Sequence, residues 1–65
     1  MQPYQERVVN ERAELAEKVN KLGAFLFTAQ FDTVPREEQF RLARQHFLMS
    51  AYLAVLDERI RVFVK

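Results

Sequence analysis

Two side chains near the middle of the chain, His46 and Ser50, have the types and spacing of a catalytic base and a nucleophile. On a helix they would lie one turn apart on the same face. A serine nucleophile of this kind also needs an acid that orients the histidine. The next acid along the chain, Asp57, lies eleven residues beyond His46, about 16 Å along a helix axis. No triad can form within one chain, so we predict a protein that is not an enzyme.

The sequence also lacks the residues for metal and phosphate-loop chemistry. With one histidine and no cysteine, the chain cannot supply a tetrahedral zinc site. The residue three before His46 is Ala43 rather than the glutamate of the di-iron bundle pattern. A glycine-rich phosphate-binding loop cannot be written with one glycine, Gly23. We therefore expect neither a metal nor a cofactor.

Anion binding is the chemistry that the first half of the chain could perform, because it contains an aromatic residue and several cations: Tyr4, Arg7, Lys18 and Lys21. If this segment is helical, the three cations fall within about half a turn around its axis. The alternative is a solvated face with i,i+4 ion pairs such as Glu17 with Lys21, each worth a few tenths of a kcal/mol. Both interpretations remain open at this point.

The charge of the whole chain is nearly balanced, with ten basic and nine acidic residues among 65 and a net charge of +1. No global field therefore attracts the protein to duplex nucleic acid or to an anionic membrane. The longest uncharged run is far shorter than the roughly 20 residues of a membrane-spanning helix. No apolar segment resembles a signal peptide. We expect a cytoplasmic protein that binds neither duplex nucleic acid nor membranes.

Two helices must position these residues. Apolar residues recur at helical spacing after Pro3, which suits the first turn of a helix, and they predict a helix over residues 3–29. Asp32, Pro35 and the two acids that follow mark a second start, and predict a helix over residues 35–63. Because the connection is short, the helices should be antiparallel. The expected fold is an all-α helical hairpin, one domain over residues 1–65.

The second helix has more apolar surface than one partner helix can cover. It carries a core-facing row and two further rows: Leu42, His46, Met49, Leu53, Leu56, Ile60 and Phe63; Phe40, Phe47, Ala51 and Ala54; and Leu48, Tyr52, Val55 and Val62. A chain of this size buries only about 60% of its unfolded surface, and it has no disulfide to help. We therefore expect a homo-oligomeric helical bundle.

Along one side of the first helix, side chains spaced seven residues apart become progressively smaller: Val9, Ala16 and Gly23. Such an arrangement lets another backbone approach. Glycine costs about 1 kcal/mol of helix propensity relative to alanine, so Gly23 should have a specific packing reason. One hypothesis is that Gly23 and the apolar residues after it build the subunit interface that holds Lys21.

The chain resembles a family of small helical proteins of tailed phages over almost its whole length. The resemblance is carried by the segments PYQERVVNERAELAEKVNKLGAFL and EEQFRLARQHFLMSAYLAVLDERI, and by the string R-V-x-x-E-x-x-E-L-x-x-K-x-x-K-L-x-A-F from Arg7 to Phe25. The best-understood members are anti-CBASS proteins, which bind and sequester the cyclic oligonucleotide signals of bacterial immunity. The resemblance implies an oligomer of helical hairpins, a hexamer, that holds cyclic dinucleotides between neighbouring subunits.

The resemblance also implies roles for individual residues. A lysine that contacts phosphate matches Lys21, and a tyrosine that packs on the bases matches Tyr4. Members that also bind cyclic trinucleotides have an arginine whose nearest match is Arg59, but they have a hydroxyl residue in place of Gly23, so a trinucleotide site stays in question. The implied function is a non-catalytic sponge that blocks CBASS immunity in the cytoplasm of an infected bacterium. The alternative is a structural or protein-binding phage oligomer without a nucleotide ligand.

Overall fold

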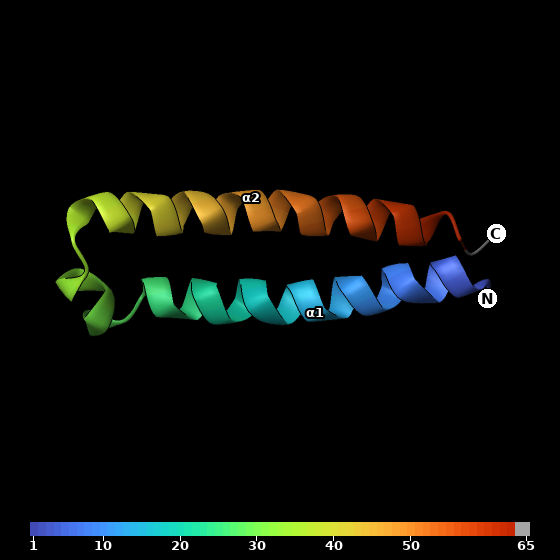
Figure 1. Cartoon of the computed structure of the whole chain (residues 1–65), viewed down its shortest axis with the longest axis horizontal. Helices are drawn as coiled ribbons and strands as arrows, with labels where there is room; N and C mark the ends of the chain where they lie inside the picture. The colour runs from blue at the N-terminus through green and yellow to red at the C-terminus, as the bar shows by residue number, and fades with distance from the viewer. Residues whose placement is uncertain (64–65) are drawn as a thin grey trace.

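Two long antiparallel helices form a hairpin in the computed structural model, which describes residues 1–63 (Figure 1). Helix α1 spans Pro3–Leu26, a short 3-10 helix η1 spans Ala29–Thr33, and helix α2 spans Arg36–Arg61. Residues 1–63 contain no strand, in agreement with the all-α fold expected from the sequence. None of the helices in this range is long and apolar enough to cross a membrane. The start of α1 and the end of α2 lie at the same end of the hairpin.

Helix α1 ends at Leu26, three residues before the predicted end at Ala29. The cause is Thr28, whose hydroxyl donates a hydrogen bond of 2.7 Å to the carbonyl of Phe25. The same hydroxyl accepts a hydrogen bond of 3.3 Å from the amide of Phe31 and so caps η1. A threonine that bonds to nearby backbone in this way competes with the helical ladder. The prediction was wrong here because it followed the apolar spacing past this threonine.

Helix α2 begins at Arg36, with Pro35 as its cap, close to the predicted start. The side-chain amide of Gln39 donates hydrogen bonds of 3.0 Å from Nε2 to the backbone carbonyls of Phe31 and Val34, and so ties the connection to the first turn of α2. The helix ends at Arg61 rather than at the predicted Phe63, whose amide instead forms a tighter turn with the carbonyl of Ile60. Such terminal turns commonly shift a helix boundary by one or two residues.

The hairpin is a thin rod with a small core. It measures 47 × 15 × 14 Å, and its radius of gyration is 14.9 Å, whereas a compact domain of this length would have about 11 Å. Among the described residues 1–63, four hydrophobic side chains are buried: Val8, Leu15, Val19 and Leu56. Four more from the predicted core-facing row of α2 pack against them: Met49, Leu53, Ile60 and Phe63. That row is therefore confirmed as the inner face of α2.

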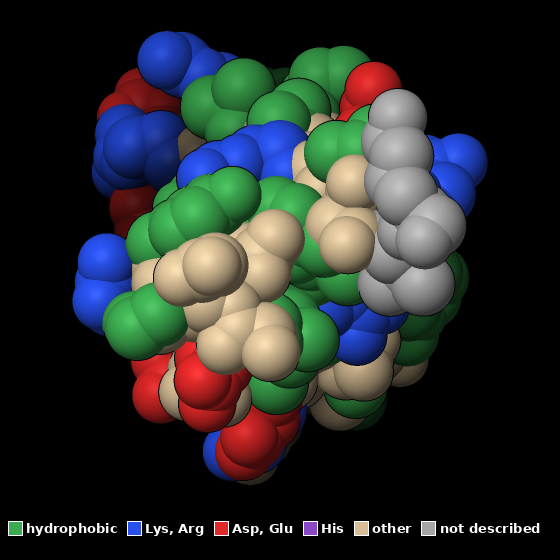
Figure 2. Space-filling model, turned by 90° about the vertical axis from the view of Figure 1, so that its right-hand side faces the viewer, with side chains coloured by type: hydrophobic (Ala, Val, Ile, Leu, Met, Phe, Trp, Pro, Cys, Tyr) green, Lys and Arg blue, Asp and Glu red, His purple; other side chains and the backbone are tan. Residues whose placement is uncertain are grey.

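The other two apolar rows of α2 lie largely on the surface of the hairpin. Their large side chains are 45–70% exposed: Phe40, Phe47, Leu48, Tyr52, Val55 and Val62. Figure 2, which looks onto the end of the rod where α1 begins and α2 ends, shows hydrophobic side chains at the surface among charged ones. Isolated exposed apolar residues are ordinary, but contiguous rows mark interaction surfaces.

Gly23 packs against the second helix of its own chain. A Cβ built at Gly23 would lie 2.9 Å from Nε2 of His46, closer than real Cβ contacts allow. The glycine therefore makes room for the imidazole, and no second copy of the chain is needed to explain it. The hypothesis that Gly23 serves a subunit interface is replaced by this intrachain contact.

Gly23→Ala is expected to lower the free energy of unfolding by up to about 2 kcal/mol. Displacing the imidazole should lower the free energy of unfolding by about 1–3 kcal/mol, the usual cost of overpacking. The better helix propensity of alanine should raise it by about 1 kcal/mol. In a His46→Ala background the clash is absent, so the same substitution should stabilise by about 1 kcal/mol. Urea unfolding of the four variants, followed by circular dichroism, measures both effects. Equal effects in the two backgrounds would show that the contact with His46 is unimportant.

One ion pair joins the two helices within residues 1–63. Nε of Arg12 lies 2.7 Å from Oδ1 of Asp57, and both side chains are about two-fifths exposed. The hydrogen bond and the charge of Asp57 raise the pKa of Arg12 above its usual value. This contribution to stability is complete below the usual pKa of arginine and disappears only as the pH rises through the raised one, so it is constant near neutral pH. Exposed pairs of this kind are weak.

Candidate functional site

Tyr4 lies at the first turn of α1 and is held there by an aromatic contact. Its ring meets the ring of Phe63 edge to face, with centroids 5.8 Å apart, and half of the side chain remains exposed. The first turn is stabilised by a hydrogen bond of 2.8 Å, which the backbone amide of Gln2 donates to the side-chain oxygen Oε1 of Gln5. The structure therefore presents a positioned ring that still has free surface.

The three candidate cations of α1, Arg7, Lys18 and Lys21, all lie on its surface. Nζ of Lys21 is 2.9 Å from Oε1 of Glu17, and both side chains are mostly exposed, as the solvated-face interpretation predicted for this pair. Arg7 and Lys18 take part in no ion pair within residues 1–63. Exposed pairs are worth little in water, so each of these cations can turn toward an incoming anion.

The candidate residues of α1 do not converge within one chain. Tyr4 and Lys21 are 17 residues apart on one continuous helix, which places them about 25 Å apart along its axis. A single cyclic dinucleotide is too short to contact both. Lys18 and Lys21, three residues apart, are neighbours on the helix surface. A site that uses Tyr4 together with Lys21 must therefore be built by two copies of the chain.

Sequence comparison agrees with the hairpin and decides the family. The model of the family described as Sequestin matches residues 2–62, which include α1, η1 and α2. The chain belongs to the Sequestin family. It is also 41% identical over 63 residues to a protein of Enterobacteria phage T4 named "Uncharacterized 7.5 kDa protein in denB-rIIB intergenic region", covering 97% of this chain and 98% of the phage protein. No solved structure matches the chain significantly. The resemblance to a family of small phage proteins is confirmed.

The residues tied to a trinucleotide site are also separated in this Sequestin chain. Arg59 is exposed in the last turn of α2, where a cation interacts favourably with the helix dipole. Gly23 packs against His46, and His46 is thirteen residues before Arg59 on the same helix, about 20 Å away. These two positions therefore cannot contact one ligand within a single hairpin.

Residues suggestive of catalysis have structural partners in the Sequestin fold. His46 packs against Gly23, and Asp57 binds Arg12 on the other helix. Among residues 1–63, no three side chains of histidine, aspartate or glutamate gather in a way that could hold a metal ion. The described surface does offer groups that can bind a ligand: cations, an amide and aromatic rings.

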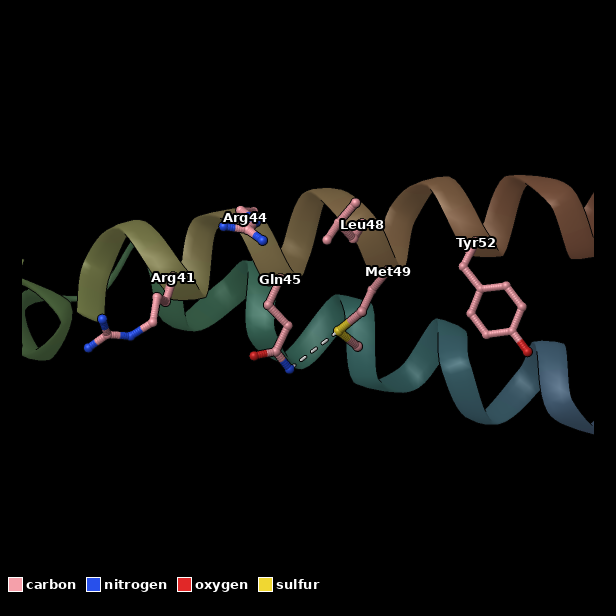
Figure 3. Close-up of a pocket in the computed structure, with 6 residues that line it drawn as sticks. All are labelled: Arg41, Arg44, Gln45, Leu48, Met49 and Tyr52. Atoms are coloured by element: carbon pink, nitrogen blue, oxygen red, sulfur yellow. Dashed lines mark hydrogen bonds between the residues drawn. The ribbon is translucent and has the colours of Figure 1, made fainter. Parts of the chain in front are cut away.

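A groove on the flank of α2 was missed by sequence reasoning. It has a volume of about 490 Å³, and we call it the α2 groove; its lining residues are Arg41, Arg44, Gln45, Leu48, Met49 and Tyr52. Figure 3 shows Gln45, Met49 and Tyr52 directed toward α1, with Arg44 and Leu48 lying over α2 itself. The spacing of these residues over three turns could have revealed it. Leu48, Met49 and Tyr52 had instead been assigned to apolar rows, which separated them from the arginines.

Proposed function

We propose that this protein is a non-catalytic sponge that binds cyclic dinucleotides between the subunits of a homo-oligomer, a hexamer, and so blocks CBASS immunity in the cytoplasm of an infected bacterium. The observation that carries the proposal is membership of the Sequestin family over residues 2–62, a family whose name describes sequestration. The relative from phage T4 supports a phage setting. The proposed ligand contacts are Tyr4, Arg7, Lys18 and Lys21. A second site, which would bind cyclic trinucleotides, would use Arg59.

The chemistry of the ligand fits these contacts. A cyclic dinucleotide has two phosphates and two base faces, so its receptor needs cations and flat side chains. Stacking supplies about 1–3 kcal/mol per base, and a hydrogen bond to a charged group about 1.5–3 kcal/mol. Two of each give roughly 5–12 kcal/mol before the cost of ordering, and nanomolar binding needs about 12 kcal/mol. A preformed pocket that excludes water is therefore required.

Two features of the hairpin favour a pocket between subunits. Tyr4 and Lys21 lie too far apart to meet one ligand within a chain. The apolar row of α2 that contains Phe40 and Phe47, which the hairpin leaves exposed, offers a surface that copies of the chain can bury against one another. A closed symmetric assembly would use the same surface on every subunit.

The test is calorimetric titration of the purified protein with a panel of cyclic dinucleotides and trinucleotides, followed by recovery of the ligand. We expect tight binding of at least one cyclic dinucleotide and its recovery unchanged. Light scattering after size exclusion should show an oligomer. A clean 7.7 kDa monomer, or no binding by any member of the panel, would contradict the proposal. The second candidate, a structural or protein-binding phage oligomer, predicts an oligomer without nucleotide binding, and the exposed apolar rows favour it equally.

Tyr4→Ala is expected to weaken cyclic-dinucleotide binding by about 1–3 kcal/mol, the contribution of one stacked base. Tyr4→Phe should keep most of the affinity because the ring face is retained. Loss of the contact with Phe63 should also lower the stability of the alanine variant by about 0.5–1.5 kcal/mol, and the phenylalanine variant should be spared. Titrations of the three proteins measure binding, and thermal unfolding measures stability. Equal affinities for wild type and Tyr4→Ala would exclude stacking; equal losses in both variants would assign the role to the hydroxyl.

A further inference from the structure

The α2 groove combines donors for an anion with a flat ring on one flank of one helix (Figure 3). Its volume of about 490 Å³ lies within the range of about 300–1,000 Å³ that is usual for small-molecule sites. The groove is distinct from the α1 residues considered above, because all of its lining residues belong to α2.

The two arginines of the groove are available to a ligand. Within residues 1–63, Arg44 takes part in no ion pair. Nε of Arg41 lies 2.7 Å from Oε1 of Glu38, but this pair is largely exposed and therefore weak. Next to Arg44, the side chain of Gln45 donates to the sulfur of Met49, at 3.7 Å, a poor acceptor. A guanidinium group matches the geometry of a phosphate with two parallel hydrogen bonds.

The apolar part of the groove offers exposed surface to a base. Tyr52 is 45% exposed and Leu48 is 55% exposed, so both offer free surface beside the arginines. The ring of Tyr52 is directed toward α1 (Figure 3). A ring that is anchored on a helix and partly open to water is a stacking platform for any base, because every base has a π face.

The flank that carries the groove also carries residues of α1. Tyr4 and Phe63 meet across the hairpin and so mark one flank. Tyr52 and Arg41 precede Phe63 by 11 and 22 residues, close to whole numbers of turns, which places them on the same side of α2. Lys18 follows Tyr4 by 14 residues, nearly four turns, which places it on the same side of α1.

The register of the hairpin sets Lys18 level with Tyr52. Gly23 lies against His46. Because the helices are antiparallel, a residue that follows His46 on α2 lies beside a residue that precedes Gly23 on α1 by the same number of positions. Tyr52, six residues beyond His46, therefore lies level with about the sixth residue before Gly23, which is Glu17. Lys18 is the next residue and is on the flank of the groove, so its ammonium can reach an anion held there.

We infer that the α2 groove forms one side of the site that sequesters the nucleotide. In this groove Tyr52 stacks on a base, and Arg41 and Arg44 bind phosphate. Lys18 lies at the edge of the groove. This inference rests on the proposed function for its ligand, a cyclic dinucleotide. The inference adds ligand contacts from α2 to those proposed on α1. These α2 residues already lie together within one chain, so no second copy is needed to bring them to the ligand. The open side of the groove is where a neighbouring subunit would add its own Tyr4 or Lys21.

The test compares variants of the groove with matched controls in titrations against the cyclic dinucleotide that wild type binds best. Tyr52→Ala should weaken binding about 5- to 150-fold, and Tyr52→Phe should retain most of the affinity. Arg44→Gln should weaken binding about 10- to 150-fold. Its control is Arg36→Gln, which removes the same charge from the first turn of α2, outside the groove, and should leave the affinity unchanged.

Light scattering of each variant completes the experiment. An unchanged oligomer size with weakened binding in Tyr52→Ala and Arg44→Gln supports the inference. Wild-type affinity in both variants would overturn it while leaving the sequestering function intact, whereas a wild type that binds no cyclic dinucleotide would overturn both. A smaller particle in either variant would show that the groove is a contact between subunits, which also overturns the inference.

Discussion

Leu56→Ala is expected to lower the free energy of unfolding by about 2–5 kcal/mol, the range for a buried leucine replaced by alanine. Leu56 has 0% exposure and lies in a core of only four buried side chains. The stability of a chain of this length is about 3–10 kcal/mol, so the loss would be a large part of the total. Thermal and urea unfolding, followed by circular dichroism at several protein concentrations, measures it.

The matched control for this experiment is Leu48→Ala on the same helix. Leu48 is 55% exposed in the hairpin, so the same substitution should cost under about 0.5 kcal/mol. A loss below about 1 kcal/mol for Leu56→Ala would contradict the core that we describe. If Leu48→Ala instead destabilises strongly and in a concentration-dependent way, another subunit covers this side chain.

Lys21→Ala is expected to weaken cyclic-dinucleotide binding by about 1.5–3 kcal/mol, the contribution of one hydrogen bond to a charged group. The size of the oligomer should not change, because the lysine side chain is exposed and contacts only Glu17 within residues 1–63. Calorimetric titration measures the affinity, and light scattering measures the size.

Glu17→Gln serves as the control, since it removes the partner of Lys21 and leaves the ammonium in place. With the competing carboxylate gone, affinity should be equal to that of wild type or higher. Wild-type affinity in Lys21→Ala would return this lysine to the solvated face and exclude it from the site. An equal loss in both variants would show that the ion pair, rather than the free ammonium, is what the ligand requires.

Particular residues show how far the sequence could predict the candidate site. The types and order of Arg7, Lys18 and Lys21 were evident from the string that begins at Arg7, and Tyr4 lies just before it. The structure places these four side chains at the surface. The contact of Tyr4 with Phe63 could not be predicted, because these residues are far apart in the sequence. Only the alignment of the two helices in the hairpin brings them together. The α2 groove is a different case, because all of its lining residues lie on one helix and their spacing could have revealed it; Tyr52 was instead assigned to an apolar row.

Local signals by themselves determined the two helices, the balanced charge and the excess of apolar surface on α2, because each depends on residues within a few turns of one another. Thr28 was also a local signal, and its hydroxyl ended α1 where apolar spacing predicted continuation. Only the tertiary structure decided that Gly23 faces His46 and that Arg12 pairs with Asp57. It also decided that Tyr4 meets Phe63. These relations depend on the register and the handedness with which one helix folds back on the other. That geometry is determined by the packing of the whole hairpin, and no segment encodes it alone.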